Sequence, residues 1–521
     1  MVLSSSIIDF GDPSNRWMLV VCVVSARILY QVTLVVYNLY VSPLAKFPGP
    51  KLAAASHWYE TYYSLLYEGG GRYYLKITEW HEKYGPIIRI NPNELHIRDP
   101  EYFETIYSQG NDIDKVEWQR FMFSIPSSIG STVEHDVHRI RKAPLLSFFS
   151  KARVQQQAPN IIARLETMFD RLRKEYVGKA KPVNLCDLFS CFAADVITRY
   201  SFGKSYDFLG YPDFICPFST AVAGFKKAGQ ISIQFPIVPR LLRTIPDQWV
   251  SILRPSFAPV ASFKKEVFRL IAAEKARKAD GSTKDTDQSI FSQLLDSNLP
   301  ASELESHRLM EEGVAVIGAA IDTTKWSTVV IIFHILQNPI VLERVRQELD
   351  KAIPDPSSLP PLTTLEQLPY FMACIEEGIR LSYGGFVRSP RRHPKPLQYQ
   401  SWTIPARTPI CTDAWTMHHD ENIFPDSFSF RPERWLNDPK SPSGKSLSRY
   451  ILAFGKGSRV CLGMQLAYAE MELSLAALFR QFDLQLHETT RKDIDVYSDA
   501  LGPTPHPDSK GPRVLIRSRS D

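Results

Sequence analysis

The stretch that decides the fold is Phe454–Gly463, with the sequence FGKGSRVCLG, near the carboxyl end of a chain of 521 residues. An amphipathic run over residues 464–482 follows at once and predicts a helix. Cys461 therefore stands on a glycine-rich loop at a helix N-terminus, where free amides and the helix dipole stabilise a thiolate. Arg459 adds positive charge nearby, and Gly457 lets the backbone approach a flat, bulky group.

The spacing around the cysteine separates two interpretations. A lone cysteine beside a tight turn is more often buried and inert. The complete pattern Phe-x-x-Gly-x-Arg-x-Cys-x-Gly, however, resembles the haem-ligand loop of the cytochrome P-450 family, the haem-thiolate monooxygenases. The resemblance implies haem b as cofactor, Cys461 as the thiolate ligand of its iron, and Phe454, Gly457 and Arg459 as further cofactor-binding residues. A thiolate ligand pushes electron density onto the iron and favours O–O cleavage.

The family also carries Glu-x-x-Arg on a core helix, and the chain has it at residues 377–380. Glu377 and Arg380 lie one helical turn apart on one face. Alone, such a pair is typical of a solvated face, but the surrounding sequence is apolar. The family's third partner is present as Arg434 in FRPERW. The resemblance implies that these three charges form a structural network and take no part in catalysis.

A long apolar run between residues 302 and 337 predicts a central helix. Ser302 and Glu305 form a capping-box pattern at its start, and an Asn-Pro pair ends it. Its centre, residues 314–321, is apolar on every side, which predicts burial in a large core. Eight residues are too few to span a membrane.

The middle of this helix is AAIDTT at residues 319–324, where the family has Ala/Gly-Gly-x-Asp/Glu-Thr-Thr. The resemblance implies a catalytic pair: the Thr323 hydroxyl bonds the oxygen molecule being activated, and Asp322 relays protons. Ala320 replaces the usual glycine, which narrows the oxygen groove and leaves the local helix bend in question. The alternative is that both are ordinary polar helix residues, with the threonine bonded back to a carbonyl.

Haem propionates need cationic partners. Arg459 is the first candidate, and Arg391 follows the Glu-x-x-Arg helix where the family often has one. The family's Trp-x-x-x-Arg pattern is altered here, and we match its two positions to His138 and Lys142. Arg141 serves instead if the register shifts by one residue. Because a lysine is a point charge, its propionate contact would be less directional than that of an arginine.

Other cofactor sites find no support in the sequence. His135 and His138, and the pair His418-His419, could suggest a metal site, but no cysteine or carboxylate cluster in the sequence accompanies them. There is no G-x-G-x-x-G and no G-x-x-x-x-G-K-[ST] motif, so no nucleotide site is visible. Electrons must therefore come from a separate protein.

Residues 17–40 form an apolar segment of 24 residues, long enough to cross ~30 Å of hydrocarbon as a helix. Arg27 near its middle costs ~2.5–3.5 kcal/mol on insertion scales. An amphipathic interfacial helix and a cleaved signal peptide are the alternatives. The segment 43–51, PLAKFPGPK, holds three prolines and predicts a stiff, extended hinge. The predicted domains are thus an anchor at 1–42, this hinge, and a haem domain at 52–521.

Composition and charge indicate the binding partners and the cellular compartment to expect for the protein. A net charge of +5 on 61 basic and 56 acidic residues gives no reason to expect nucleic-acid binding. Seven scattered cysteines without a C-x-x-C pair, and no Asn-x-Ser/Thr sequon, favour a reducing compartment. Lys46 and Lys51 follow the apolar segment, which by the positive-inside rule predicts a cytosolic body. Residues 275–288 are charged and predict a surface loop.

The resemblance extends from the proline-rich segment to the carboxyl end. It implies a mainly α fold, a single large helical haem domain with small β-sheets. It implies insertion of one oxygen atom from O2 into a lipophilic small molecule, with electrons from an acidic flavoprotein, an NADPH-cytochrome reductase, on the same endoplasmic reticulum membrane. The sequence is most similar in style to filamentous-fungal members of secondary metabolism, such as the trichodiene-oxygenase-like group, which suggests a terpenoid or polyketide substrate. The alternatives are a haem-thiolate isomerase or dehydratase that needs no external electrons, and a non-catalytic haem carrier or sensor.

Overall fold

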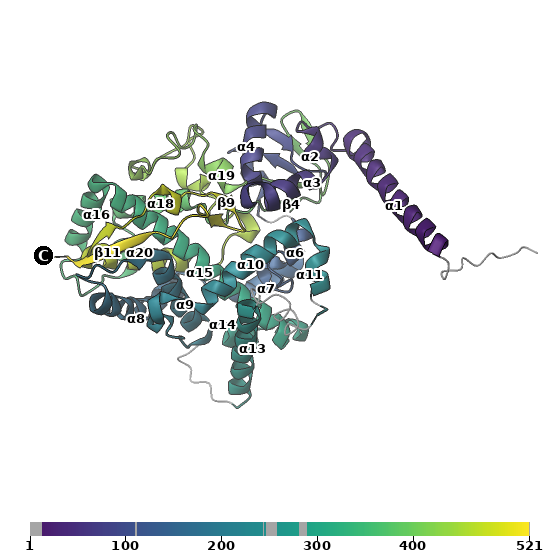
Figure 1. Cartoon of the computed structure of the whole chain (residues 1–521). Coiled ribbons are helices and arrows are strands. Elements are labelled where there is room, and N and C mark those ends of the chain that lie inside the picture. The colour runs from purple at the N-terminus through teal and green to yellow at the C-terminus, as the bar shows by residue number, and fades with distance from the viewer. Residues whose placement is uncertain (1–12, 110–111, 243, 246–257, 281–288, 520–521) are drawn as a thin grey trace, which may run out of the picture.

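Helix α1 (Pro13–Val36) projects from the body of the protein in the computed structural model (Figure 1). The structure describes residues 13–109, 112–242, 244–245, 258–280 and 289–519. A short π-helical turn, η1 (Tyr37–Val41), continues α1. The stretch Arg16–Val41 is long and apolar enough to cross a membrane, and its apolar window is unburied. The other described helix that passes this test, α15 (Ser306–Gln337), is mostly buried and belongs to the core.

The proline-rich segment 43–51 differs from the extended hinge that its sequence predicts. Its first residues form turns, and Leu44 and Phe47 are buried. The Phe47 ring stacks on Trp402 with 5.0 Å between centroids. The Arg89 N–H donates to the Pro48 carbonyl at 2.7 Å. The prolines end the helix, but the apolar side chains between them dock the segment on the body.

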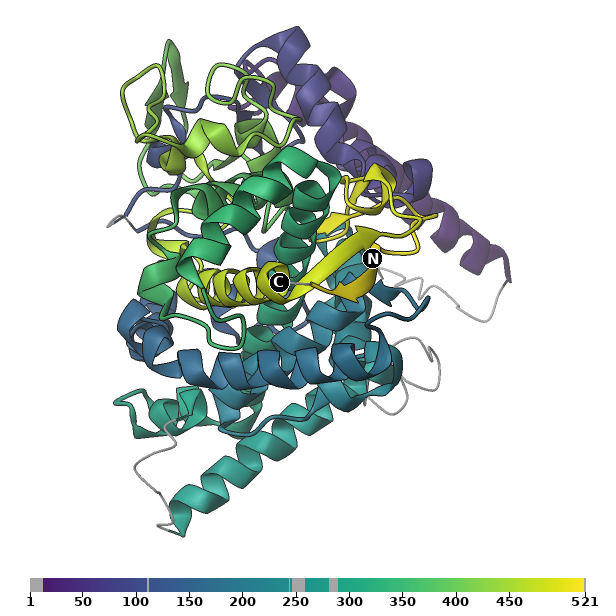
Figure 2. The same ribbon diagram turned by 90° about the vertical axis from the view of Figure 1, so that its left-hand side faces the viewer.

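Helices make up most of the body, as predicted, and Figure 2 shows α20 in yellow above α8 in blue. Six of the long helices, α9, α10, α13, α16, α18 and α20, pack against α15, and α8 packs on α9 and α20. The long helices and their bounds follow. They are α4 (Tyr73–Tyr84), α7 (His135–Leu146), α8 (Lys151–Glu175), α9 (Leu185–Phe202), α10 (Pro217–Gln234), α13 (Ala258–Ala279), α16 (Pro339–Ala352), α18 (Pro369–Ser382) and α20 (Met464–Gln481). The short ones are α2 (Lys51–Ala55), α3 (Trp58–Thr61), α5 (Phe103–Ile106), α6 (Trp118–Phe121), α11 (Ile237–Leu242), α14 (Ile290–Asp296), α17 (Leu362–Leu365) and α19 (Ala414–His418).

Short strands form small sheets at the edge of this helical body. One sheet has the order β1-β2-β7-β4, with β1 and β2 paired antiparallel and β2 parallel to β7. A second has the order β3-β11-β8, and β5-β6 and β9-β10 are antiparallel pairs. The strands are β1 (Ile87–Arg89), β2 (Leu95–Ile97), β3 (Val183–Asn184), β4 (Arg391–Arg392), β5 (Leu397–Tyr399), β6 (Trp402–Ile404), β7 (Pro409–Cys411), β8 (Phe482–Leu486), β9 (Ser498–Asp499), β10 (Pro503–Thr504) and β11 (Arg513–Ser518).

Two helix boundaries differ from the sequence prediction. The helix α15 begins at Ser306 after a 3-10 turn, η8 (Ala301–Leu304), and Glu305 gives no side-chain cap. The predicted capping box is therefore wrong, because its two residues fall in and just after that turn. Helix α13 continues to Ala279, so the charged segment 275–279 is helical; residues 281–288 lie outside the described residues. Charge alone does not end a helix that has a packed face.

Candidate active site

A cavity of about 460 Å³ lies between α15 and the loop that carries Cys461. The centre of α15 lines it with Ala315, Val316, Ala319 and Ala320. Residues 314–321 are therefore apolar on every side of the helix, although only one side is buried in the core. One side of the helix packs into the core, and the other faces this space, where Ala319 is exposed.

Cys461 opens onto this cavity from the opposite wall and is enclosed by protein elsewhere. Its backbone N–H donates to the Phe454 carbonyl at 2.9 Å, which closes the loop. The Phe454 ring lines the cavity and packs on Tyr468, with 5.4 Å between centroids. Burial raises the pKa of the Cys461 thiol, and the Gly463 N–H partly opposes this. The helix N-terminus therefore acts as expected, but without outweighing burial.

Gly457 lies where two backbone segments approach each other closely, and its predicted part in cofactor binding stays a prediction. Its φ of +71° is in the left-handed region, and a Cβ there would lie 1.9 Å from the Tyr107 carbonyl oxygen. It is absent from the cavity lining. Gly457 therefore permits a close approach of two backbone segments, and does not itself face the cavity.

Four cations line the cavity without a carboxylate partner within 4.0 Å among the described residues: Lys115, Arg391, Lys456 and Arg459. Arg459 donates to the Thr132 carbonyl at 2.7 Å, while its Nε is buried without a partner. Burial, and then Arg391, lowers the pKa of Arg459 to about 10. Burial also lowers the pKa of Lys115 well below its usual range, and both arginines add to this. Such a cluster fits an anionic ligand, and haem propionates supply that charge.

Lys115 was not identified in the sequence because it belongs to none of the recognised motifs. Its Nζ donates to the Gly130 carbonyl at 2.5 Å. The structure brings it beside Arg391, which donates to Ser389 Oγ at 2.8 Å. Only the fold joins the segment at 115 to the strand at 391, so no local pattern could have revealed this cation.

Of the two α7 residues matched to the family's Trp-x-x-x-Arg pattern, only His138 lines the cavity. His138 is buried, and burial, followed by Arg459, lowers the pKa of its ring to about 2. Lys142 does not line the cavity: its Nζ donates to the Ser458 carbonyl at 2.8 Å. Arg141 points elsewhere and pairs with Glu303 at 2.8 Å. The propionate contacts of His138 and Lys142 stay predictions, and in this structure Lys142 supports the cysteine loop.

The two predicted catalytic residues on α15 point in different directions. Thr323 lines the cavity, and its hydroxyl donates back to the Ala319 carbonyl at 2.7 Å. Asp322 is absent from the cavity lining and pairs with Lys226 at 2.5 Å and with Lys325. Burial opposes ionisation of Asp322, but these lysines hold its pKa well below the usual range. The back-bonded threonine is the geometry of the alternative interpretation, yet its position on the cavity wall is that of the family's residue.

The predicted charge network is present, with Glu377 and Arg380 fully buried and Arg434 partly buried. Glu377 accepts two bonds from Arg380, at 2.8 and 2.9 Å, and one from Arg434 Nε at 3.0 Å. The Trp435 indole donates to the same carboxylate at 2.9 Å. Arg380 also donates to the Ser427 carbonyl at 2.6 Å. Every oxygen of the buried carboxylate is satisfied, so this network fixes α18 against the segment that precedes the cysteine loop.

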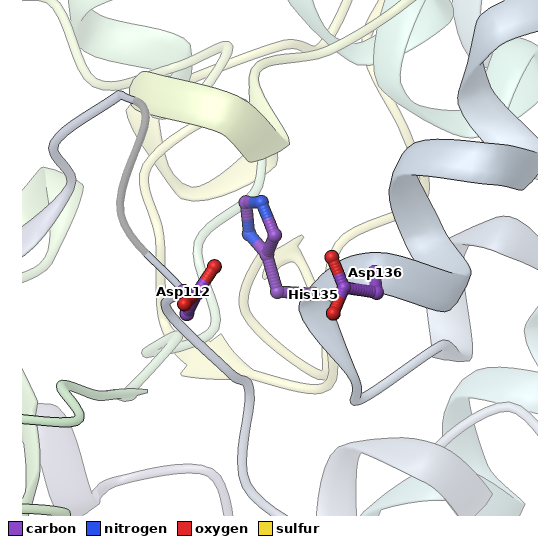
Figure 3. A group of neighbouring side chains, drawn as sticks. All are labelled: Asp112, His135 and Asp136. Atoms are coloured by element: carbon purple, nitrogen blue, oxygen red, sulfur yellow. The ribbon is translucent and has the colours of Figure 1, made fainter.

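Figure 3 shows a group that the sequence did not reveal, in which Asp112 and Asp136 flank His135. Their ligand atoms lie within 4.8 Å of one another. The two aspartates are exposed, and Asp136 pairs with Arg139 at 3.4 Å. The group therefore carries no assignment as a metal site. His418, the other histidine considered for a metal site, is buried. Its two ring nitrogens form hydrogen bonds with the Arg380 carbonyl and the Leu452 N–H.

Comparison with known proteins identifies the class. The family model described as Cytochrome P450 matches residues 54–509. A cytochrome P450 monooxygenase, orf4, of Eupenicillium brefeldianum is 39% identical, covering 93% of this chain and 96% of its own. The monooxygenase sdnE of Sordaria araneosa is 38% identical, covering 94% and 96%. Tryptophan 6-hydroxylase fscE of Fusarium equiseti is 37% identical, covering 94% and 95%.

The chain belongs to the cytochrome P450 family. The predictions of family, mainly helical fold, haem cofactor with thiolate ligation and haem-dependent monooxygenase class are therefore confirmed, as is the likeness to fungal members. The trichodiene-oxygenase-like subgroup stays a prediction.

Proposed function

We propose that this protein uses Cys461 as the thiolate ligand of haem and inserts one atom of dioxygen into a lipophilic small molecule. The observation that carries the proposal is the cavity itself, with Cys461 on one wall, Thr323 on the opposite wall and unpaired cations at its edge. Bound haem supplies oxygen activation, favoured by electron density from the thiolate.

The chain's own side chains have distinct tasks in this proposal. Arg391, Arg459, His138 and Lys115 bind the propionates, and Lys142 supports the cysteine loop through the Ser458 carbonyl. The Thr323 hydroxyl has one donor and two acceptor positions. Its oxygen therefore accepts a hydrogen bond from a proton donor while its own hydrogen is donated to the Ala319 carbonyl. Asp322 relays protons only after releasing one of its two lysines.

The test is the spectrum of the reduced carbon-monoxide complex. The wild-type protein should give the long-wavelength band of haem-thiolate proteins, and Cys461→Ser should lose it while remaining folded. Retention of the band in that variant contradicts the ligand assignment. Consumption of NADPH that depends on both reductase and substrate separates a monooxygenase from an isomerase, a dehydratase or a haem carrier.

The substrate is lipophilic, because the wall beside Thr323 consists of Ala315, Val316, Ala319 and other apolar groups. We propose a terpenoid or polyketide intermediate of fungal secondary metabolism. A relative acts on tryptophan, so an aromatic amino acid is included in the screen. Reductase-coupled turnover of these three substrate classes, scored by product mass, decides among them.

We propose that the electron donor is an acidic flavoprotein reductase that docks over α7 and the cysteine loop. The sequence has four cations on these two segments: Arg139, Arg141, Lys142 and Lys456. Only Arg139 is largely exposed, at 73%, whereas Arg141 is 12% exposed and paired with Glu303. Steering by charge should therefore rest on fewer groups than the sequence suggested.

Residues 1–42 are proposed as a single-pass anchor in the endoplasmic reticulum membrane, 43–51 as the connection, and 52–521 as the cytosolic haem domain. The unburied apolar window in Arg16–Val41 supports this. Exposed apolar side chains also lie on the adjoining short helices, namely Leu52, Trp58, Leu66, Ile237 and Leu241. The Trp58 ring packs on the Phe235 ring with 5.8 Å between centroids. This contact brings the exposed side chains near residue 58 next to those near residue 237. They form a second contact with the bilayer.

A further inference from the structure

Two buried cysteines that have no part in the functions described above lie against each other where α9 meets the segment leading into α10. Cys191 is on α9, and Cys216 is the N-cap residue of α10. The Cys191 thiol donates to the carbonyl of Phe214, two residues before Cys216, at 3.0 Å. The neighbouring Ser190 Oγ donates to Ser219 Oγ, three residues after Cys216, at 3.4 Å. These contacts bracket the two thiols, which are hydrogen-bonded to each other.

The turn before Cys216 is fixed by its own packing. Asp213 and Phe214 have φ of +49° and +58°, in the left-handed region that residues other than glycine rarely adopt. The Phe214 ring is buried, and the Arg171 guanidinium lies over it, 4.0 Å from the ring centroid. Arg171 also donates to the Tyr211 carbonyl at 2.7 Å. Such a conformation persists only where its surroundings determine it, so the turn holds Cys216 in place beside α9.

The two thiols differ in how readily they ionise. The hydrogen bond with Cys191 lowers the pKa of the Cys216 thiol, and the N–H groups of Ser219 and Phe218 add to this against burial. The same hydrogen bond, and then burial, raises the pKa of Cys191. Cys216 is therefore the thiol that supplies a thiolate, which is the reactive form. Ile215 beside it is 60% exposed, so Cys216 lies just beneath the surface, within reach of a small oxidant.

We propose that Cys191 and Cys216 are a modification site, where hydrogen peroxide converts the two thiols into a reversible disulfide. The Cys216 thiolate attacks one peroxide oxygen and the O–O bond breaks, which leaves a sulfenic acid and a hydroxide that takes up a proton. The Cys191 sulfur then attacks the Cys216 sulfur, and the S–S bond forms as the Cys191 proton and the sulfenic hydroxyl leave as water. Two thiols are oxidised, and one peroxide is reduced to two waters.

Reduction of the disulfide needs only a low-molecular-weight thiol. Glutathione restores both cysteines by thiol–disulfide exchange, in keeping with the transient disulfides of a reducing compartment. While it lasts, the bond ties the first turn of α10 to α9. Helix α10 packs on α6, α13 and α15, so the disulfide adds a covalent restraint at one end of a helix otherwise held by packing. The inference does not depend on the proposed function, because it requires only that peroxide reaches Cys216.

The test is peptide mapping of the full-length holoprotein treated with hydrogen peroxide. Remaining thiols are blocked with N-ethylmaleimide in denaturant, and the protein is digested with trypsin without reductant. Wild type should give a linked pair of peptides containing Cys191 and Cys216, two hydrogens lighter than their sum, and should lose it when glutathione is added. Cys186 lies on the same tryptic peptide as Cys191, so the variants decide which of them is linked. Tryptic cleavage at Lys226 of the oxidised, still folded protein should slow about threefold or more.

Cys216→Ser and Cys191→Ala each remove one sulfur and should leave the fold intact. Serine is a preferred N-cap residue, and alanine is a small apolar replacement inside α9. Neither variant should give the linked peptides or the slower cleavage at Lys226. Cys374→Ala is the matched control, because it removes another buried thiol, on α18, and it should behave as wild type.

Three results would overturn the inference: no linked peptides in peroxide-treated wild type, a link that survives in either single variant, or Cys216 oxidised to sulfinic acid without a link. Equal cleavage at Lys226 before and after oxidation would overturn the restraint on α10. The carbon-monoxide spectrum, recorded on the same untreated samples, tests the proposed function separately.

Discussion

Lys226 on α10 and Asp322 on α15 are joined by an ion pair with 2.5 Å between Nζ and Oδ2. The residue expected to relay protons thus also links α10 to α15, the helix that lines the cavity. Its second oxygen is held by Lys325 of the same helix. The two lysines therefore differ in what they hold: Lys226 joins α10 to α15, whereas Lys325 acts within α15.

Replacing Lys226 by Met should loosen α10. Both partners are partly shielded from solvent, with side chains 17% and 23% exposed, so the loss should be about 1–3 kcal/mol in unfolding free energy. Thermal unfolding and protease cleavage within α10 measure this. Lys325→Met is the comparison and should leave the cleavage rate of α10 near wild type. Equal cleavage in the two variants would show that the pair does not hold the helices together.

The stability of the protein should depend on pH through Glu472. This side chain is buried, and burial, followed by the charge of Glu366, raises its pKa to about 8. A raised pKa means that the stabilising contribution is complete below the unfolded-state value and is lost as pH rises toward 8. Glu472→Gln is neutral throughout, so it should gain relative to wild type, by at most about 1.4 kcal/mol per pH unit between pH 5 and 8. Parallel thermal midpoints at every pH would refute this.

Electron transfer from the reductase should respond to Arg139 more than to Arg141. Arg139 and its partner Asp136 are both largely exposed to solvent on α7, whereas the pair of Arg141 with Glu303 is shielded. Arg139→Glu should slow reduction at low ionic strength severalfold, and added salt should narrow the difference because it screens exposed charges. Stopped-flow reduction of the haem measures this, with Arg139→Lys as the charge-conserving control. Rates that ignore both the variant and the salt would place the docking surface elsewhere.

Removing residues 1–42 should release part of the protein from membranes and leave the haem spectrum intact. Release should be incomplete, because the exposed apolar side chains of α2, α3 and α11 remain. Adding Trp58→Ser and Leu241→Ser to the truncation should increase the soluble fraction in membrane sedimentation. A truncated protein that fails to take up haem would contradict a separable anchor.

The sequence was most informative where function depends on short, contiguous motifs. Cys461, Phe454 and the Glu377–Arg380–Arg434 network lie where the motifs predict. Contacts that depend on tertiary approach were not predicted. Gly457 meets the Tyr107 carbonyl and Lys142 meets Ser458, contacts between segments far apart in the chain.

The same reason applies to the residues that no motif named. Lys115 and Glu470 of α20 are ionisable side chains that line the cavity. Both are buried there without an ionic partner among the described residues. A lysine in a loop and a glutamate in an amphipathic helix are typical of solvated positions. Their exceptional surroundings exist only once α7, α15, α20 and the first sheet are assembled.

Thr323 gives the sharpest test of the catalytic wall. Its hydroxyl donates to the Ala319 carbonyl at 2.7 Å, yet its free acceptor positions face the cavity. Thr323→Ala removes a bond that only folds back on its own helix, so haem content and thermal stability should change little. Loss of the hydroxyl should leave protons less well directed, so peroxide per NADPH oxidised should rise and product per NADPH should fall, each severalfold.

Thr324→Ala separates this role from that of its neighbour. Thr324 is 7% exposed and also lines the cavity, so Thr324→Ala tests whether its hydroxyl substitutes for that of Thr323. The methyl group of Ala320 also lines the cavity. Ala320→Gly should ease oxygen access to the cavity. Adding it to Thr323→Ala should not restore the yield of product per NADPH oxidised. The measurement is product and peroxide formed per NADPH oxidised, in wild type and in each of these variants, with the substrate found by screening. Wild-type coupling in Thr323→Ala would show that its hydroxyl has no part in proton delivery.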